Sequence, residues 1–333
     1  MKKINILITG AGSGVGQSVI RSLIYSKIKR NLNLFISDIT NFNPYPIYKL
    51  KYLKIPKVEN KNSKKILKRI IIKNKINIVF IGSEYEIVFF SKNKDFFEKI
   101  KNLKVCVSNL KTINLSNDKF KTYEFLKNHN LPYPKTLKIS KNTTFNSVIK
   151  KIKKPFILKN RFGTSSRNVF EINDLVQFKN CLKSMKYPLA QEKLIPYSNH
   201  RFKKEEEFTC SFFTLQNKNI LGPFVARRVL KFGTSWIVDV SNSKNKITKL
   251  IEDISKKIHN LGSFNIQLIN TKKGPIPFEF NSRFSGTTSV RSKFGFNEPE
   301  FFIKDNFLKN KLNQKKIKIK KGNVLRYIAE KVL

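Results

Sequence analysis

Acidic residues, cysteines and histidines are scarce in this sequence. Only 22 of its 333 residues are Asp or Glu, whereas 67 are Lys or Arg, so the formal net charge is +45. The three cysteines, Cys106, Cys181 and Cys210, lie far apart and form no CxxC motif. This spacing argues against a disulfide framework or a zinc site and suits a reducing compartment. Three histidines in the whole chain are too few for a His-rich metal site.

Long apolar runs are missing as well. No segment approaches the roughly 20 apolar residues that a membrane-spanning helix needs. The apolar run in MKKINILITG meets the glycines of GAGSGVG too soon to be the core of a signal peptide. Hydrophobic residues nevertheless make up 40% of the chain and aromatic residues 12%, which indicates a globular protein with room for two or three domains. We therefore expect a cytoplasmic protein without a membrane span.

The excess of positive charge has two interpretations. A nucleic acid or an anionic membrane would attract so basic a protein. However, lysines run from residue 2 to residue 331 and are not confined to one arm, although NKLNQKKIKIKKGN (310–323) is the densest run. We favour a bias towards Lys, Asn and Ile over the whole surface. A nucleic-acid partner is therefore not expected, whereas anionic substrates would still be attracted.

The N-terminal part of the sequence alternates between apolar strands and helices. INILIT (4–9) predicts a buried strand that runs into a glycine turn, and GVGQSVIRSLIYS (14–26) has its apolar residues at helical spacing. Other elements of this part are a helix at 62–75 and strands at 31–40, 76–86 and 104–109. Such alternation implies a parallel sheet with helices on both faces, so residues 1–110 predict a Rossmann-like domain.

The rest of the chain has a different pattern. A helix is expected from Ser116 or Asn117 to Pro132 and Pro134. After residue 140 short strands dominate, and NTKKGP signals a hairpin. The strands are expected at 153–160, 189–195, 206–216, 219–230 and 262–281, and the helices at 173–185 and 244–262. This pattern indicates an α+β segment with antiparallel sheets.

Alternate glycines from Gly10 to Gly16 follow the first strand and open the first helix. Their spacing approximates the dinucleotide-binding fingerprint, with Gly16 one position late. Asp38 ends the second strand, where a ribose-binding acid would lie. A nicotinamide or flavin nucleotide is one interpretation. The other is a tight turn that needs glycine and binds no cofactor.

Two further segments have features of a nucleotide site. PFILKNRFGTSSRNVF (155–170) places Lys159 at the end of an apolar strand and follows it with a loop of small residues, which could hold and cover phosphates. In LAQEKLIPY, the residues from Glu192 to Leu194 could form the hinge that contacts an adenine base. A lysine-tipped hairpin and an ordinary strand are the alternatives for these two segments.

The segment FEFNSRFSGTT (278–288) places Glu279, Asn281 and Arg283 at alternate positions. Period-two geometry turns them to one side of a strand and leaves the phenylalanines on the core face. The other strand of the expected hairpin carries Gln267. Oxygen ligands from Gln, Glu and Asn suit Mg²⁺, and a guanidinium would neutralise a transferring phosphoryl group. A solvent-facing strand is the alternative, but acids are scarce enough in this chain to favour a role for Glu279.

Together and in this order, these segments resemble the ATP-grasp superfamily, and most of all the ATP-binding halves of the carbamoyl-phosphate synthase large subunit and its stand-alone relatives. The resemblance covers nearly the whole chain and includes NDKF, PFILKN, QEKLIP, EEEFTCSFF, FNIQLIN and FEFNSRF. It implies a Rossmann-like pre-ATP-grasp domain (1–110), then a two-lobed ATP-grasp domain with a small lobe (111–190) and a C-terminal lobe with the metal site (191–333). The glycine turn then faces the substrate cleft and holds no dinucleotide.

The resemblance also implies roles for individual residues, with ATP and Mg²⁺ or Mn²⁺ as cofactors. The metal ligands would be Gln267, Glu279 and Asn281. Arg283 and Lys159 would act in catalysis. The ATP-binding residues, with a flap over 161–168, would be Lys119, Lys159, Gly163, Thr164, Ser165, Ser166, Glu192, Leu194 and Glu207. Ser282 departs from the family, which usually has proline at that position.

The implied activity is ATP-dependent ligation of a small-molecule carboxylate to an amine. The carboxylate would attack the γ-phosphate of ATP, and the amine would then attack the acyl-phosphate. GPFVARRVLKFGTSWIVDV offers cations for the substrate carboxylate or for orienting the acyl-phosphate, and Arg228 is the catalytic candidate among them. A basic hairpin face is the alternative. Other substrate contacts are expected from Gly12, Gly14, Arg227, Lys231 and Arg291.

Three other functions stay open at this point. A kinase of the same fold would stop at phosphoryl transfer. An NAD(P)-dependent reductase would use the glycine turn, but it leaves Gln267, Glu279 and Asn281 without a role. A nucleic-acid-binding protein would need a stacking-aromatic motif or a concentrated basic face, and the sequence has neither. Many relatives of the family dimerise, so a homodimer is one expected assembly.

Overall fold

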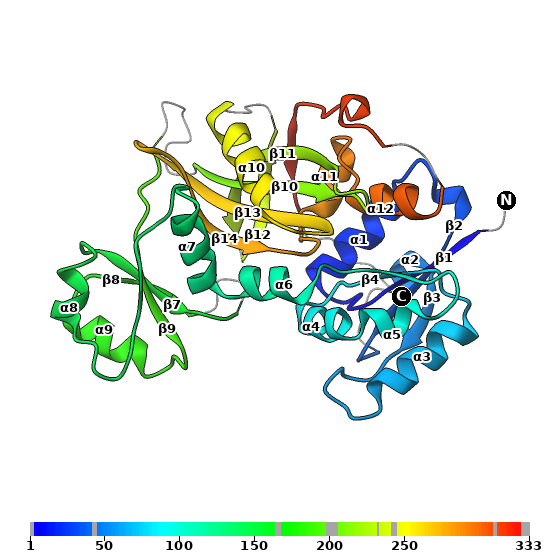
Figure 1. Ribbon diagram of the computed structural model, residues 1–333, viewed down its shortest axis with the longest axis horizontal. Coiled ribbons are helices and arrows are strands. Elements are labelled where there is room, and N and C mark those ends of the chain that lie inside the picture. The colour runs from blue at the N-terminus through cyan, green and yellow to red at the C-terminus, as the bar shows by residue number, and fades with distance from the viewer. Residues whose placement is uncertain are drawn as a thin grey trace.

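The computed structural model describes residues 3–41, 45–163, 168–197, 206–231, 233–240, 245–308 and 312–327. Three sheets follow one another along the long axis of the molecule (Figure 1). The N-terminal sheet lies at one end, a small antiparallel sheet at the other, and a large antiparallel sheet between them. The predicted combination of α/β and α+β parts is thus confirmed. None of the helices in these ranges is long and apolar enough to cross a membrane.

The N-terminal sheet is parallel, with the strand order β3-β2-β1-β4-β5. Apolar residues of its strands are buried on both faces, because helices cover both. The strands are β1 (Ile4–Ile8), β2 (Leu32–Asp38), β3 (Lys51–Lys54), β4 (Ile78–Phe80) and β5 (Lys104–Cys106). The helices are α1 (Gly14–Ile24), α2 (Tyr45–Tyr48), α3 (Ser63–Lys73), α4 (Glu84–Lys92) and α5 (Lys94–Glu98), with a 3-10 turn at Lys29–Asn31.

One strand of this sheet is shorter than the sequence predicts. The chain leaves the sheet after Phe80 and begins helix α4 at Glu84, although 76–86 has the pattern of a single strand. Glu84 and Glu86 favour a helix start here, because the N-terminal end of a helix carries partial positive charge. Glu84 therefore lies at the carboxyl edge of the parallel sheet, where ligands bind in folds of this type.

Two helices, α6 (Leu110–Asn117) and α7 (Lys119–Asn128), link this sheet to the small one. The cap of α7 is Asp118, which accepts hydrogen bonds from the backbone N–H groups of Phe120 and Lys121. The expected start at Ser116 or Asn117 is therefore wrong, because both residues end the preceding helix. Asp118 also accepts from Arg161 Nε and Nη2 at 2.7 and 2.6 Å, which ties α7 to the small sheet.

The small sheet is antiparallel, with the order β6-β9-β7-β8. One of its faces is covered by two helices, and Phe156 packs there against Phe145 and Phe178. Its strands are β6 (Thr136–Lys138), β7 (Phe156–Asn160), β8 (Val169–Ile172) and β9 (Pro188–Glu192), and its helices are α8 (Phe145–Ile149) and α9 (Leu175–Leu182).

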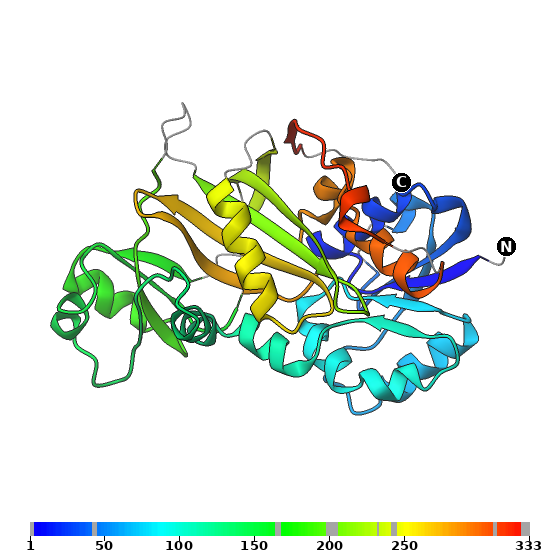
Figure 2. The ribbon, with the colours of Figure 1, turned by 45° about the horizontal axis from the view of Figure 1, so that its top comes forward.

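The large sheet is antiparallel, with the order β14-β13-β10-β11-β12-β15. Helix α10 (Asn245–Lys257) lies across one face (Figure 2) and buries Ile247, Ile251 and Ile254 there. The strands are β10 (Glu207–Thr214), β11 (Ile220–Lys231), β12 (Thr234–Asp239), β13 (Gly262–Thr271), β14 (Gly274–Asn281) and β15 (Asn323–Leu325). Helices α11 (Thr288–Lys293) and α12 (Glu298–Asn306) and a 3-10 turn (Gln314–Lys316) complete this part.

The large sheet and the N-terminal sheet share one apolar core. Phe284 and Phe302 meet Phe80 edge-on, with ring centres 5.4 and 5.6 Å from its own. Helix α1 packs against α11, where the Oγ atoms of Ser18 and Ser289 lie 3.0 Å apart. These contacts hold the carboxyl edge of the parallel sheet against the end of β14.

Candidate active site

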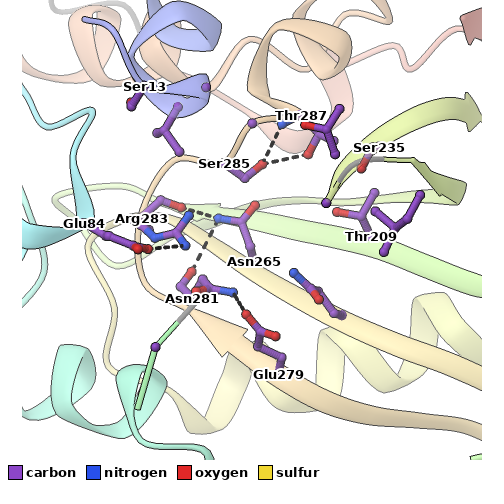
Figure 3. Close-up of a pocket in the computed structure, with 18 of the residues that line it drawn as sticks. Ser13, Glu84, Thr209, Ser235, Asn265, Glu279, Asn281, Arg283, Ser285 and Thr287 are labelled. Carbon is purple, nitrogen blue, oxygen red and sulfur yellow. Dashed lines mark hydrogen bonds and ion pairs between the residues drawn. The ribbon is translucent and has the colours of Figure 1, made fainter. Parts of the chain in front are cut away.

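A cavity of about 700 Å³ lies where the three sheets meet. Its described lining comes from the turns after β1 and β4, from the end of β7 and the loop after it, and from strands of the large sheet, and Figure 3 shows part of it. Predicted residues from distant parts of the sequence come together here. Those in the lining are Gly14, Gly163, Arg228, Gln267, Glu279, Asn281 and Arg283.

The predicted metal ligands lie on the hairpin of β13 and β14. Gln267 is the cross-strand partner of Glu279, and Asn281 Nδ2 donates to Glu279 Oε1 at 3.1 Å (Figure 3). One carboxylate and amide oxygens are hard donors of the kind that Mg²⁺ takes, with phosphate and water at its other positions. No group of three or more His, Cys, Asp or Glu in the described residues could hold a metal by itself. The donor set therefore fits Mg²⁺ that arrives with a phosphate-bearing ligand.

Arg283 lies between β14 and the N-terminal sheet. Its Nη2 atom lies 3.3 Å from Glu84 Oε2 (Figure 3). Its Nη1 atom donates to the carbonyl oxygen of Phe284 at 3.1 Å. Asn265 Nδ2 donates to the carbonyl oxygen of Arg283. The guanidinium is thus held in place by a carboxylate 199 residues away in the sequence.

Strand β14 contains a bulge at this point. The register shifts between Gln267 and Leu268, so Phe278 is an extra residue of β14 without a cross-strand partner in β13. The ring centre of Phe278 lies 5.7 Å from Lys159 Nζ, whereas Phe280 is fully buried. The expectation that all the phenylalanines of this segment form the core face is therefore wrong for Phe278.

Arg228 connects three strands of the large sheet. Its Nε and Nη2 atoms donate to Glu207 Oε1 at 3.1 and 2.5 Å, and Nη2 also donates to Gln267 Oε1 at 2.9 Å. Glu207, which the resemblance assigns to ATP binding, is thus paired with a cation. The amide oxygen of Gln267, one of the predicted metal ligands, thus accepts a hydrogen bond from a cation.

Lys119 and Lys159 come together beside the cavity, behind its lining. Lys159 is buried and donates to Gln191 Oε1 at 2.7 Å, while Lys119 Nζ donates to the carbonyl oxygen of Gly163 at 2.5 Å. Burial, with the neighbouring charge of Lys119, lowers the pKa of Lys159 to about 7, and Glu279 opposes the shift. Burial also lowers the pKa of Lys119. Lys159, with its lowered pKa, is thus placed beside Lys119 where a bound anion would restore its charge.

The expected hinge lies farther along the small sheet. Glu192 ends β9, where its backbone N–H donates to Lys135 O at 2.8 Å and its Oε2 accepts from Lys135 N at 3.1 Å. Leu194 is buried, and neither Glu192 nor Leu194 is in the described lining of the cavity. Of the expected flap, Thr164, Ser165 and Ser166 lie outside the residues that the structure describes.

The glycine turn has a packing role. A Cβ atom on Gly16 would lie 2.2 Å from the carbonyl oxygen of Gly10, and one on Gly10 would lie 2.7 Å from Ser83 N, so side chains have no space where the turns after β1 and β4 meet. Gly12 N donates to Asp38 Oδ2 at 2.7 Å. The acid that a dinucleotide site would use for ribose therefore binds the turn itself. Gly14 lines the cavity, but Gly12 does not.

Two of the expected substrate contacts lie on the large sheet but outside the described cavity lining. Arg227 is buried and pairs with Asp239 at 2.6 Å. Lys231 Nζ lies 5.2 Å from a ring centre of Trp236. Both cations therefore contact neighbouring strands, where they support the sheet.

Arg291, the third expected contact outside the described lining, is fully buried. Its Nη1 atom lies 3.1 Å from Glu298 Oε1, and both side chains are 0% exposed. Nη2 donates to Thr209 Oγ1 at 3.3 Å, which joins α11 to β10. The structure therefore gives Arg291 a packing role.

Several residues of the lining were not predicted. Glu84 and Asn265 surround Arg283, Ser285 and Thr287 follow it, and Arg326 reaches the cavity from the segment after β15. The acidic start of α4 is a signal that could have identified Glu84. No local pattern identifies Arg326, because a distant strand pairing brings it to the cavity.

A family model described as an ATP-grasp domain matches residues 116–287, just over half of the chain. Three solved structures share the fold. The carboxyaminoimidazole synthetase of Staphylococcus aureus with ADP is 15% identical and has a TM-score of 0.70, over 92% of this chain and 79% of that one. The L-amino acid ligase of Bacillus licheniformis is 14% identical with a TM-score of 0.67, over 92% and 74%.

The third is the biotin carboxylase domain dimer of the Hydrogenobacter thermophilus 2-oxoglutarate carboxylase, which was solved with MgADP and bicarbonate. It is 13% identical with a TM-score of 0.73, over 97% of this chain and 74% of that one. A comparison with curated proteins found no similar sequence. From the family match and the shared fold, we conclude that this chain belongs to the ATP-grasp family.

Proposed function

We propose that this protein is an ATP-dependent ligase that joins the carboxylate of one small molecule to the amine of another and releases ADP and phosphate. The observation that carries the proposal is the grouping of Glu279, Asn281 and Arg283 on one cavity wall, with Lys119 and Lys159 behind it. Fold relatives solved with ADP or MgADP, and one named as an amino acid ligase, support it.

The proposed mechanism needs no protein nucleophile. Lys119 and Lys159 would contact phosphates of the nucleotide, because burial without an anionic partner favours their binding an anion. Arg283 would offset charge on the transferring phosphoryl group, and Glu84 holds its guanidinium in place beforehand. Glu279 and Asn281 would hold Mg²⁺, which when bound neutralises phosphate oxygens. The substrate carboxylate would then form an acyl-phosphate, which the amine attacks.

The test is ADP release with Mg-ATP across a panel of carboxylates and amines, in the wild type and in Glu279→Ala. We expect the variant to lose at least about a hundredfold in turnover, because the only carboxylate among the proposed ligands is removed. Glu252→Ala, at an exposed position on α10, removes the same charge away from the cavity and should behave as the wild type. Unchanged turnover in Glu279→Ala would refute the metal assignment.

The mass of the product separates the ligase from a kinase of the same fold. An amide with one equivalent of ADP identifies a ligase, and a stable phosphorylated product identifies a kinase. Binding of NADPH without binding of ATP would instead favour a reductase. The hydrogen bond from Gly12 N to Asp38 speaks against that last function, because it occupies the acid that ribose would need.

We also propose that the functional units follow the boundaries 1–110, 111–190 and 191–333, and that the protein acts in the cytoplasm. A homodimer and Mn²⁺ in place of Mg²⁺ belong to the same set of proposals, as does closer kinship to carbamoyl-phosphate synthase. Sedimentation at several protein concentrations tests the dimer, and ATP turnover with each metal tests whether Mn²⁺ can replace Mg²⁺.

A further inference from the structure

Among the residues that the structure describes, three arginines line the cavity, and they differ in their partners. Arg228 donates to Glu207, and Arg283 lies 3.3 Å from Glu84. Arg326 donates from Nη2 to the carbonyl oxygen of Gly286, and among the described residues no carboxylate pairs with it. An arginine that faces a partly enclosed space without an anion is unusual, because removing a charge from water is costly unless an opposite charge compensates.

The chain holds Arg326 at this position through its backbone. Strand β15 pairs with the outer side of β12, and Arg326 N continues the pairing by donating to Trp236 O at 2.8 Å. Burial, together with the charge of Arg21, lowers the pKa of Arg326 to about 10. The side chain is therefore still protonated at neutral pH. A fixed cation thus reaches the cavity from an edge strand.

Two hydroxyl groups, which lie 2.7 Å from each other, and the start of a helix surround Arg326 at this end of the cavity. Figure 3 shows Ser285 and Thr287 on the opposite side of Arg283 from Glu279. Gly14 and Val15 open helix α1 and line the cavity, and the first-turn N–H groups of a helix lack partners inside it. The acids in the described lining are Glu84 and Glu279. Neither belongs to the turn at Gly286, which Arg326 contacts.

We propose that Arg326 binds an anionic group, a carboxylate or a phosphate, at the end of the non-nucleotide substrate that lies away from ATP. This inference rests on the proposed function and narrows its substrates. They are small molecules that carry an anionic group in addition to the carboxylate that is activated. Arg326 selects them because its planar guanidinium binds two oxygens of one group, and the donors around it complete the contact.

The test measures binding of two probes, inorganic phosphate and acetate, by titration calorimetry at fixed ionic strength. The protein is the full chain saturated with Mg²⁺ and a non-hydrolysable ATP analogue, so that the phosphate subsites of the nucleotide are filled. Arg326→Gln should bind the preferred probe at least about tenfold more weakly than the wild type. Arg326→Lys should keep more affinity for phosphate than for acetate, because a lysine serves as a point charge but loses the fork.

The matched control is Arg69→Gln. Arg69 is exposed on α3, and no residue of that helix is in the described lining of the cavity. It removes the same single charge from a protein of net charge +45. Its probe affinities should stay within about twofold of the wild type, because an exposed distant charge is screened by salt. The stronger of the two probes tells whether the substrate end is a phosphate or a carboxylate.

Three results would overturn the proposal. They are equal losses in Arg326→Gln and Arg69→Gln, unchanged binding in Arg326→Gln, and a wild type that binds neither probe. Nucleotide affinity is measured separately, and Arg326→Gln should keep it. If the nucleotide does not bind to the wild type, that result contradicts the proposed function. The probe affinities of the variants are then compared in the nucleotide-free protein, so the role of Arg326 is still tested. Circular dichroism and Arg326→Lys guard against misfolding of Arg326→Gln.

Discussion

The cations of the large sheet and those beside the small sheet are held in different ways. On the large sheet, Arg228 donates two hydrogen bonds to the carboxylate of Glu207. Arg283, at the end of β14, lies beside the carboxylate of Glu84. Beside the small sheet, Lys159 donates to a neutral amide, and Lys119 to a backbone carbonyl. A paired guanidinium keeps its charge and its position before any ligand arrives. With its pKa lowered to about 7, Lys159 is only partly charged at neutral pH, and a bound anion would raise that pKa again.

The difference divides the site into a part that is built beforehand and a part that depends on the ligand. Paired arginines contribute to the stability of the folded chain, because removing either partner leaves a buried charge uncompensated. We expect the lysines to reduce stability in the absence of ligand and to contribute to affinity in its presence. We therefore expect substitutions of the paired arginines to change mainly the stability of the folded chain. Substitutions of the lysines should change mainly ligand binding.

The largest effect is expected for the most buried pair. Arg291→Met leaves Glu298 without its cation where both side chains are 0% exposed, and should lower the free energy of unfolding by about 3–5 kcal/mol. Urea unfolding measures it. Lys193→Met is the control, because the side chains of Lys193 and its partner Glu171 are 30% and 43% exposed, and the change should cost about 1 kcal/mol or less. Equal losses would show that burial does not decide the contribution of a pair.

The lysine side of the comparison predicts the reverse. Lys159→Met should weaken nucleotide binding by about a hundredfold, because a charged hydrogen bond contributes about 1.5–3 kcal/mol. Without nucleotide, the variant should be as stable as the wild type or more stable, because a costly buried amine is replaced by an apolar chain. Lys153→Met, exposed in the same lobe, should change neither quantity. A large loss of stability in Lys159→Met would remove the distinction between the two regions.

The pH dependence sharpens the same point. Since the pKa of Lys159 is about 7 in the free protein and phosphate binding needs the ammonium form, nucleotide affinity should fall by up to about tenfold per pH unit above 7. Binding at pH 8 should take up a proton, which calorimetry in buffers of different ionisation enthalpy detects. In Lys159→Met this proton uptake should disappear. Uptake that persists would assign it to another group, of which Lys119 is the nearest.

Folding responds to pH with the opposite sign. The unfolded chain keeps the proton of Lys159 up to a pH near its ordinary pKa of 10.5, whereas the folded chain loses it above about 7. Because the unfolded state then binds more protons, the contribution of Lys159 makes the free energy of unfolding rise with pH inside that window. The difference between the wild type and Lys159→Met isolates this contribution from those of the other lysines.

The smallest effect is expected for Lys231→Ala. The side chain lies against Trp236 and outside the described cavity lining, so KM for the substrate carboxylate should change by less than about twofold. The measurement is steady-state kinetics once a substrate is known, with Arg326→Gln as the contrasting variant. A large rise in KM for Lys231→Ala would return this residue to the set of substrate contacts.

The sequence predicts the local part of this site well. Glu279, Asn281 and Arg283 were found because strand geometry repeats every two residues, and a hairpin signal placed Gln267 opposite. The alternation of strands and helices predicted the parallel sheet for the same reason. In each case the pattern lies within one or two neighbouring elements, so sequence spacing is enough to predict it.

The partners of the charged groups could not be predicted, because they depend on which distant elements meet. Nothing near Arg283 points to Glu84, and Arg326 reaches the cavity only because β15 pairs with β12. Arg227 and Arg291 were predicted to contact the substrate because the sequence does not show which distant residues pair with them. Their carboxylate partners are visible only in the folded chain.

The bulge of β14 has a consequence for how such a site can be extended. A regular strand sends consecutive side chains to opposite sides, so adding a ring beside Glu279 would require giving up a polar position. The inserted Phe278 adds the ring, next to Lys159, and leaves the alternation on both sides of it unchanged. Deleting Phe278 should restore a regular ladder in which Glu279 and Asn281 keep their direction. The bulge therefore places an extra side chain beside Glu279 while the polar positions around it keep their register.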